Sequence, residues 1–340
     1  MQKLVESQFE KCMFAAPDRI LVATDLTDVD SLVPHAIAQA KICSAKLTFI
    51  HVIPPAQAIR SQRDANPCSA NSYHDPAKII RDARLALLGV ERQVETQGIP
   101  CETKALQGSV RDVIAREIRK TDSCRLIVGT HGCSSKGRPM LGSVASDLLI
   151  SIEVPVMVVG HGARELVEHS VPRRILHPVS LMDIDHSSMQ LPLNVAQTCR
   201  AELTLLHVID PDLMKCINPE RVIEWAGARL RSLVPDTDLM PKVNTRICYG
   251  ETAEEILKAA EQTQTDLILL GSSGHSSWSF NESVAYRVLS ASSCPVLTYT
   301  HEPYRTQIEV LEAMHRKVMA DPYERVSISR QTDRSAARAL

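Results

Sequence analysis

An internal repeat restricts the fold of this chain more than any other feature of the sequence. The segment LTFIHVI at residues 47–53 returns as LTLLHVI at residues 203–209, identical at five of seven positions. Upstream, RIL at residues 19–21 returns at 174–176. The matching segments keep their order, so we predict two copies of one folding unit, over residues 17–160 and 172–300. A length of 340 residues suits two domains.

Each copy alternates short apolar runs with longer segments of helical periodicity. The apolar runs are rich in Val, Ile and Leu and too short for helices, which is typical of strands buried on both faces of a parallel sheet. The predicted strands are 19–24, 47–53, 100–106, 125–130 and 155–160, then 174–179, 203–209, 242–248, 267–272 and 295–300. The predicted helices are 31–45, 76–97, 109–120 and 143–151, then 187–200, 218–233, 252–263 and 283–291. This alternation indicates an α/β fold with two tandem, doubly wound, five-stranded parallel-sheet domains.

Three segments fall outside this pattern. Residues 54–75 are rich in Pro and small polar side chains, and we expect a mobile loop there. Residues 161–173 form the predicted linker between the copies. Residues 301–340 are expected to form a helix from about 305 to 320, followed by a disordered tail.

Composition argues against several classes of protein. The formal net charge is −2, so the chain lacks the global cationic field of nucleic-acid-binding proteins. No apolar run is long enough to span a bilayer, and the start MQKLVESQFEKCMF does not read as a signal peptide, so we expect a cytoplasmic protein without a membrane partner. The ten cysteines include no CxxC pair, and we interpret most as buried thiols, with Cys133 as the exception.

A glycine-rich segment follows the fourth strand of copy one. It reads Gly129-Thr-His-Gly132, then nine residues, then Gly142-Ser143 and a helix. Ligands of open parallel sheets bind at the carboxyl ends of the strands, and a helix N-terminus offers amide donors and a positive dipole end to a phosphate. The segment therefore predicts a phosphate site. The alternative is a flexible turn in which glycine only permits tight geometry.

Asp25 follows the first strand and is expected to face the same crevice. A carboxylate at this place can accept hydrogen bonds from both hydroxyls of a ribose. Alternatively, Asp25 caps the helix that follows.

The glycine segment, the opening RILVATD, the strand LTFIHVI and the closing VPVMVV together resemble the universal stress protein family, and the resemblance covers both copies. It implies that copy one binds ATP, with or without magnesium. By the same resemblance, Asp25 contacts the ribose, Val52 meets the adenine through its backbone, and Gly129, Gly132, Gly142 and Ser143 hold the phosphates. Other family members lack the motif and do not bind ATP.

Copy two departs from the motif. Gly271-Ser-Ser-Gly274 is kept, but Glu282 stands in place of the last glycine and Ser180 in place of Asp25. A carboxylate about 5 Å from a phosphate costs several kcal/mol at an effective dielectric near 20, so ATP should be excluded from copy two. An alignment shifted by two residues, with another group restoring the site, is the alternative.

The first hypothesis is therefore a cytoplasmic stress-response protein in which ATP orders the 133–141 loop and switches a surface for a protein partner. The alternatives are a nucleotide-independent interaction protein and a weak ATPase or autophosphorylating protein. We assign no catalytic residues and no metal ligands, because no P-loop, HExxH helix or GxSxG elbow is present. The family resemblance also implies that the closing strands 154–159 and 294–299 join the copies as an intrachain pseudo-dimer, and a homodimer stays open.

Overall fold

The computed structural model describes residues 16–55, 76–130, 140–160, 163, 171–181, 188–211, 219–234, 241–272 and 283–300. The chain divides into two compact units, Met1–Glu302 and Pro303–Leu340, and every described residue belongs to the first. Most of the predicted 54–75 loop, most of the linker and the tail lie outside the described residues. Among the helices that are described, none is both long and apolar enough to cross a membrane.

All eighteen strands and helices predicted within the two copies are present, with ends shifted by at most a few residues. The helix predicted from about 305 to 320 lies outside the described residues. Copy one contains β1 (Arg19–Ala23), α2 (Val29–Cys43), β2 (Lys46–Ile53), α4 (Pro76–Glu95), β3 (Cys101–Gln107), α5 (Val110–Thr121), β4 (Arg125–Gly129), α6 (Ser143–Ser151) and β5 (Val156–Val159). Copy two contains β6 (Arg174–Pro178), α7 (Gln190–Cys199), β7 (Glu202–Ile209), α9 (Pro219–Ser232), β8 (Val243–Tyr249), α10 (Thr252–Gln262), β9 (Leu267–Ser272), α11 (Val284–Ala291) and β10 (Val296–Thr300).

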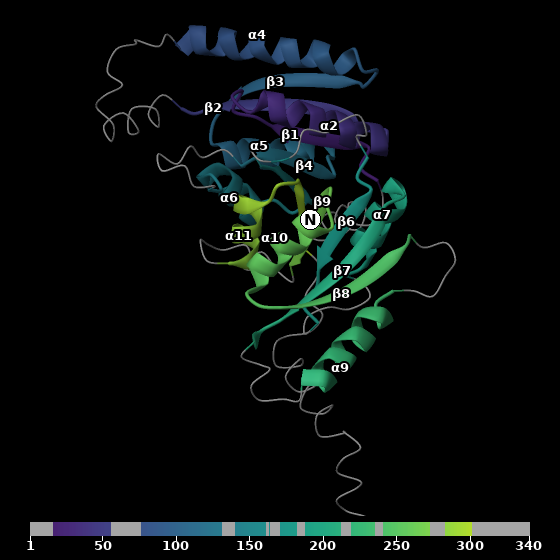
Figure 1. The fold of residues 1–340 in the computed structure, drawn as a ribbon. Coiled ribbons are helices and arrows are strands. Elements are labelled where there is room, and N and C mark those ends of the chain that lie inside the picture. Colours follow the sequence, from purple (N-terminus) through teal and green to yellow (C-terminus); the bar gives the residue numbers. More distant parts are fainter. Residues whose placement is uncertain are drawn as a thin grey trace, which may run out of the picture. The chain divides into compact units, whose positions relative to one another are not determined.

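The strands form one ten-stranded sheet in the order β3-β2-β1-β4-β5-β10-β9-β6-β7-β8 (Figure 1). Neighbouring strands within each half are parallel, and the halves meet where β5 and β10 pair antiparallel, as expected for the closing strands. In that pair Met157 faces Leu297, its own equivalent in the repeat. A pseudo-twofold axis therefore passes between Met157 and Leu297.

Helices cover both faces of the sheet, which is why the central strands are apolar along their whole length. Ile20, Leu21 and Val22 of β1 are each 0% exposed. One core cluster lies under α2, α4, α7 and α9, and the other under α5, α6, α10 and α11. Each cluster contains residues of both copies, so the two halves share their cores across the axis.

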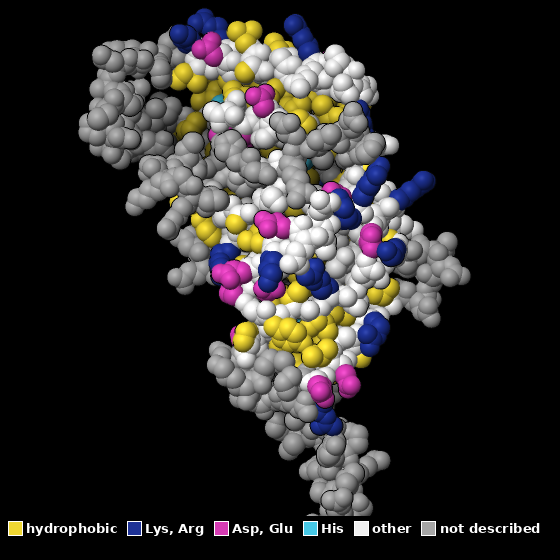
Figure 2. Space-filling view, in the orientation of Figure 1, with side chains coloured by type: hydrophobic (Ala, Val, Ile, Leu, Met, Phe, Trp, Pro, Cys, Tyr) yellow, Lys and Arg dark blue, Asp and Glu magenta, His cyan; other side chains and the backbone are white. Residues whose placement is uncertain are grey.

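Charged side chains are mixed over the surface. On the face shown in Figure 2, Lys and Arg lie interspersed with Asp and Glu between apolar side chains. This distribution agrees with the net charge of −2.

His35 makes the stability of this fold depend on pH. It lies in α2 and is 4% exposed, and burial lowers its pKa from 6.5 to about 4. The unfolded chain takes up this proton near pH 6.5, so stability is complete above that pH and is lost as the pH falls towards 4. We expect His35 to cost about 2 kcal/mol of unfolding free energy at pH 5 relative to pH 7.

Denaturant titrations of the parent and of His35→Leu at pH 7 and pH 5 measure this effect. Leucine is the residue that copy two carries at the equivalent position, Leu191. The variant should lose about 2 kcal/mol less between the two pH values than the parent does. Equal losses in both proteins would show that other groups cause the acid sensitivity.

Candidate functional site

The carboxyl ends of two neighbouring strands, β1 and β4, form the candidate ligand site of copy one. β1 lies between β2 and β4. After β1 the chain continues into α2 on one face of the sheet, whereas after β4 it continues into α6 on the other face. The winding thus reverses between β1 and β4, and ligands of open α/β sheets bind at such a point, outside the carboxyl ends of the strands.

Asp25 lies in the turn that follows β1. The backbone N–H and the hydroxyl of Thr27 both donate to Oδ1 of Asp25, at 2.8 and 2.7 Å. The residue before α2 is Asp28, whose side chain does not cap the helix but accepts a hydrogen bond of 2.5 Å from the hydroxyl of Thr24. Asp25 is therefore an exposed carboxylate held at the strand end by a local turn, and the alternative that it caps α2 is wrong.

The side chain of His51 makes the last contact between β2 and the end of β1. The Thr24 amide donates to the Ile50 carbonyl at 3.0 Å, and Nδ1 of His51 lies 3.0 Å from the Thr24 carbonyl. A carbonyl only accepts, so this ring nitrogen carries a proton. In a continued parallel ladder, the Thr24 carbonyl would accept a hydrogen bond from the next amide of β2. The side chain of His51 contacts this carbonyl instead.

Val52 is buried, and its backbone lies where β1 ends. The carbonyl of Ile50 faces β1, whereas that of Ile53 faces β3, because it accepts from the Gly108 amide at 3.1 Å. Backbone groups alternate in direction along a strand, so those of Val52 face the side that β1 has left. A flat ring placed there can be recognised by main-chain donors and acceptors.

The two described ends of the glycine segment lie together. The amide of Gly142 donates to the carbonyl of Thr130 at 3.1 Å, which places Gly142 directly beside the end of β4 at Gly129. Helix α6 begins at Ser143, as predicted, and its N-cap residue, Gly142, has no side chain with which to cap it. Gly132 lies outside the described residues, as do Cys133 and most of the 133–141 loop.

The corresponding helix of copy two is built differently. Its N-cap residue is Ser283, the equivalent of Ser143, and its hydroxyl accepts a hydrogen bond of 3.1 Å from the amide of Tyr286. One of the orphan amides that an anion would use is thus satisfied within the chain. Glu282 and Gly274 lie outside the described residues.

Tyr299 gives Gly271 a role in packing. A Cβ on Gly271 would lie 2.9 Å from the Tyr299 hydroxyl, which itself donates to the carbonyl of Ser188 at 3.0 Å. Tyr299 is 3% exposed, and burial raises its pKa. Copy one has Val159 at this position. Gly271, the first glycine of the copy-two segment, therefore leaves space for the buried ring of Tyr299.

The sequence predicts the candidate site but did not reveal two of its supporting contacts. It did not identify Thr24 as the corner that binds Asp28 and His51, although His51 returns as His207, which makes the same contact with the Val179 carbonyl at 2.9 Å. It also missed the Ser283 cap, for which serine as a favoured N-cap residue was the available signal.

Comparisons with known proteins agree on one family. A sequence profile of the universal stress protein family matches residues 17–160 and 172–300. A universal stress protein of Mycolicibacterium smegmatis is 26% identical over 305 residues, covering 82% of this chain and 95% of its own length. The crystal structure of a universal stress protein from Archaeoglobus fulgidus superposes with a TM-score of 0.60 at 21% identity, over 83% of this chain and 98% of its own.

Proposed function

Because the chain belongs to the universal stress protein family, we propose that its first half binds ATP and its second half does not. The ATP site that we propose is the crevice between β1 and β4. Asp25 would hold the ribose and the backbone of Val52 the adenine. Gly129 and Gly142 would allow the triphosphate to approach the main chain, and Ser143 would begin the helix that faces it.

The start of α6 carries this proposal. Gly142, the N-cap residue, has no side chain that could occupy the space before the helix or cap the amides of its first turn. Together with the helix dipole, these amides favour an anion. The amide nitrogen of Gly142 lies 3.1 Å from the carbonyl oxygen of Thr130. The amides at the start of α6 therefore lie beside the end of β4.

Copy two supports the contrast between the halves. Its equivalent helix start uses the Ser283 hydroxyl as an internal cap, and Ser180 replaces the carboxylate of Asp25. The two halves therefore differ at both the ribose end and the phosphate end of the proposed site.

We propose a cytoplasmic stress-response role in which ATP acts as a switch for a protein partner. ATP shifts the chain between two states only if it binds them with different affinities, and the partner must then discriminate between the same states. Slow hydrolysis or autophosphorylation is compatible with this role, but the described residues of the crevice include no group that we assign as a general base.

Isothermal titration calorimetry with ATP tests the proposal. The parent should bind about one ATP per chain. Asp25→Ala should lower the affinity about ten- to a hundredfold, because a hydrogen bond to a charged group contributes about 1.5–3 kcal/mol. Asp25→Asn keeps an acceptor for Thr27 and so preserves the turn, and it should still bind ATP more weakly than the parent.

The matched control is Ser180→Ala, at the equivalent position of copy two. It should bind ATP like the parent. Absence of binding by the parent would favour a nucleotide-independent interaction protein. Two sites per chain would contradict our account of copy two.

A further inference from the structure

Two cysteines that occupy the same position of the repeat line one cavity between the two copies. Cys43 is the last residue of α2 and Cys199 the last residue of α7, and they are equivalent in the two copies. The two helices contact each other in the core cluster that contains Met157 and Leu297. At a twofold interface a residue near the axis lies close to its own equivalent.

The two cysteines line one small cavity. It has a volume of about 30 Å³ and is bordered by α2, α7 and the start of β4 at Arg125. Cys199 also borders a much larger open groove of about 770 Å³. Cys43 is partly exposed, and Cys199 is 8% exposed. Solvent-borne reagents can thus reach Cys199 from the groove, and Cys43 is itself partly accessible.

Arg125 is a buried cation without a carboxylate partner among the described residues. It is 5% exposed, and its Nη1 donates to Oε1 of Gln39 at 2.6 Å. Its Nε is buried without any hydrogen-bond partner in the described part of the chain. Copy two has Leu267 at the equivalent position, so the repeat does not require a cation there. An unpaired buried charge is costly, which calls for a compensating anion nearby.

A thiolate can supply that negative charge. Burial raises the pKa of the Cys43 thiol above its usual value, and the charge and hydrogen bonding of Arg125 offset only part of this rise. Burial also raises the pKa of Cys199 to about 11, and Arg125 opposes this as well. Arg125 therefore favours the reactive, ionised form of both sulfur atoms over what burial alone allows.

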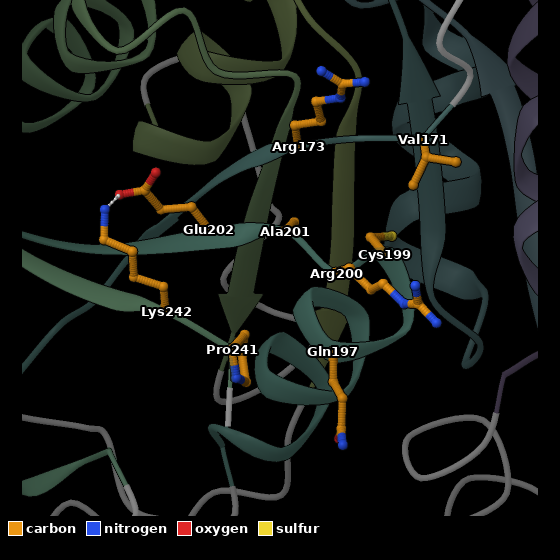
Figure 3. Close-up of a pocket in the computed structure, with 9 residues that line it drawn as sticks. All are labelled: Val171, Arg173, Gln197, Cys199, Arg200, Ala201, Glu202, Pro241 and Lys242. Carbon is orange, nitrogen blue, oxygen red and sulfur yellow. Dashed lines mark hydrogen bonds and ion pairs between the residues drawn. The ribbon is translucent and has the colours of Figure 1, made fainter. Parts of the chain in front are cut away.

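Basic side chains predominate among the described residues of the groove beside Cys199. Arg173, Arg200 and Lys242 line this described part together with one acidic residue, Glu202. Figure 3 shows Lys242 paired with Glu202, at 2.8 Å, while Arg200 lies next to Cys199. Electropositive, partly accessible surroundings are typical of cysteines that oxidise.

We propose that Cys43 and Cys199 form a disulfide across the pseudo-twofold axis when the protein meets hydrogen peroxide. The thiolate of Cys43 attacks one peroxide oxygen. An S–O bond forms, the O–O bond breaks, and the departing hydroxide takes up the thiol proton to give water. The sulfur of Cys199 then displaces the hydroxyl group of the sulfenic acid, which leaves with the Cys199 proton as a second water. Two thiols are oxidised to one disulfide, and one peroxide is reduced to two waters.

The bond would join the two halves at the ends of α2 and α7. It closes a long loop of chain, so it should restrict the unfolded state and raise the midpoint of thermal unfolding by about 5 °C. Reduction by a dithiol should reverse this shift.

Peptide mapping of the full-length protein by mass spectrometry, before and after peroxide treatment, tests the proposal. We expect a linked Cys43–Cys199 peptide pair that lacks two hydrogen atoms and disappears on reduction. Linkage through other cysteines, or oxidation of this pair to sulfinic acids without linkage, would overturn the proposal.

Substitutions test the roles of the two cysteines and of Arg125 separately. Cys43→Ser and Cys199→Ser should each abolish the linked peptide, whereas Cys248→Ser, a buried cysteine on the other face of the sheet, should leave it unchanged. Arg125→Gln should slow linkage about threefold or more, and Arg125→Lys, which keeps the charge, should retain most of the rate. Equal rates in both Arg125 variants and the parent would refute the assigned role of Arg125.

Discussion

Gly142→Glu should abolish ATP binding at concentrations that saturate the parent. The substitution gives copy one the residue that copy two carries at the aligned position, Glu282. A carboxylate about 5 Å from the phosphates costs about 3 kcal/mol at an effective dielectric near 20, which corresponds to a loss of more than a hundredfold in affinity. Calorimetry with ATP measures the loss directly.

The effect should come from charge and not from misfolding. Gly142 has φ −64° and ψ 154°, an extended conformation that any residue adopts. Gly89→Glu provides a matched control, because a Cβ at Gly89 meets nothing within 4 Å and the residue lies on the exposed side of α4. The control should bind ATP like the parent. A Gly142→Glu protein that still binds ATP tightly would place the triphosphate elsewhere.

Leu297→Ala should destabilise both halves of the chain together. Leu297 is 1% exposed and faces Met157 at the axis, inside a core cluster built from both copies. Removing a buried leucine side chain costs about 2–5 kcal/mol. Because the halves share this core, denaturant unfolding should shift as one transition, and amide hydrogen exchange should accelerate in β1 as well as in β6.

Leu85→Ala is the control for this substitution. Leu85 is 67% exposed on α4, so its removal should change stability by less than about 0.5 kcal/mol. Two separate transitions in Leu297→Ala, with only the second half weakened, would mean that the halves fold independently despite their common sheet.

The sequence predicts the fold because its local signals agree. Central strands such as β1 are apolar at successive positions, and the repeat shows each element twice, so an ambiguous segment in one copy is identified from its equivalent. The pairing of β5 with β10 came instead from the family resemblance. Periodicity alone does not reveal which edges of two sheets meet.

Residues of the candidate site could be proposed from the sequence only where the residue type itself implies a chemical role. Gly142 and Asp25 were proposed because glycine before a helix and a carboxylate after a strand have few uses. The roles of His51, Tyr299 and Arg125 depend on tertiary neighbours. Arg125 reads as an ordinary strand-edge cation, and only packing shows that it is buried beside two thiols from different copies.

Joining both copies in one polypeptide makes the β5–β10 contact insensitive to dilution, because a tethered partner is always present at high effective concentration. A symmetric homodimer of one repeat carries every substitution on both sides of its axis. In this chain the two copies differ at equivalent positions. Arg125 of copy one corresponds to Leu267 of copy two, and Gly142 corresponds to Glu282. Covalent linkage thus permits divergence: one half can specialise while the other provides the surface on which it folds.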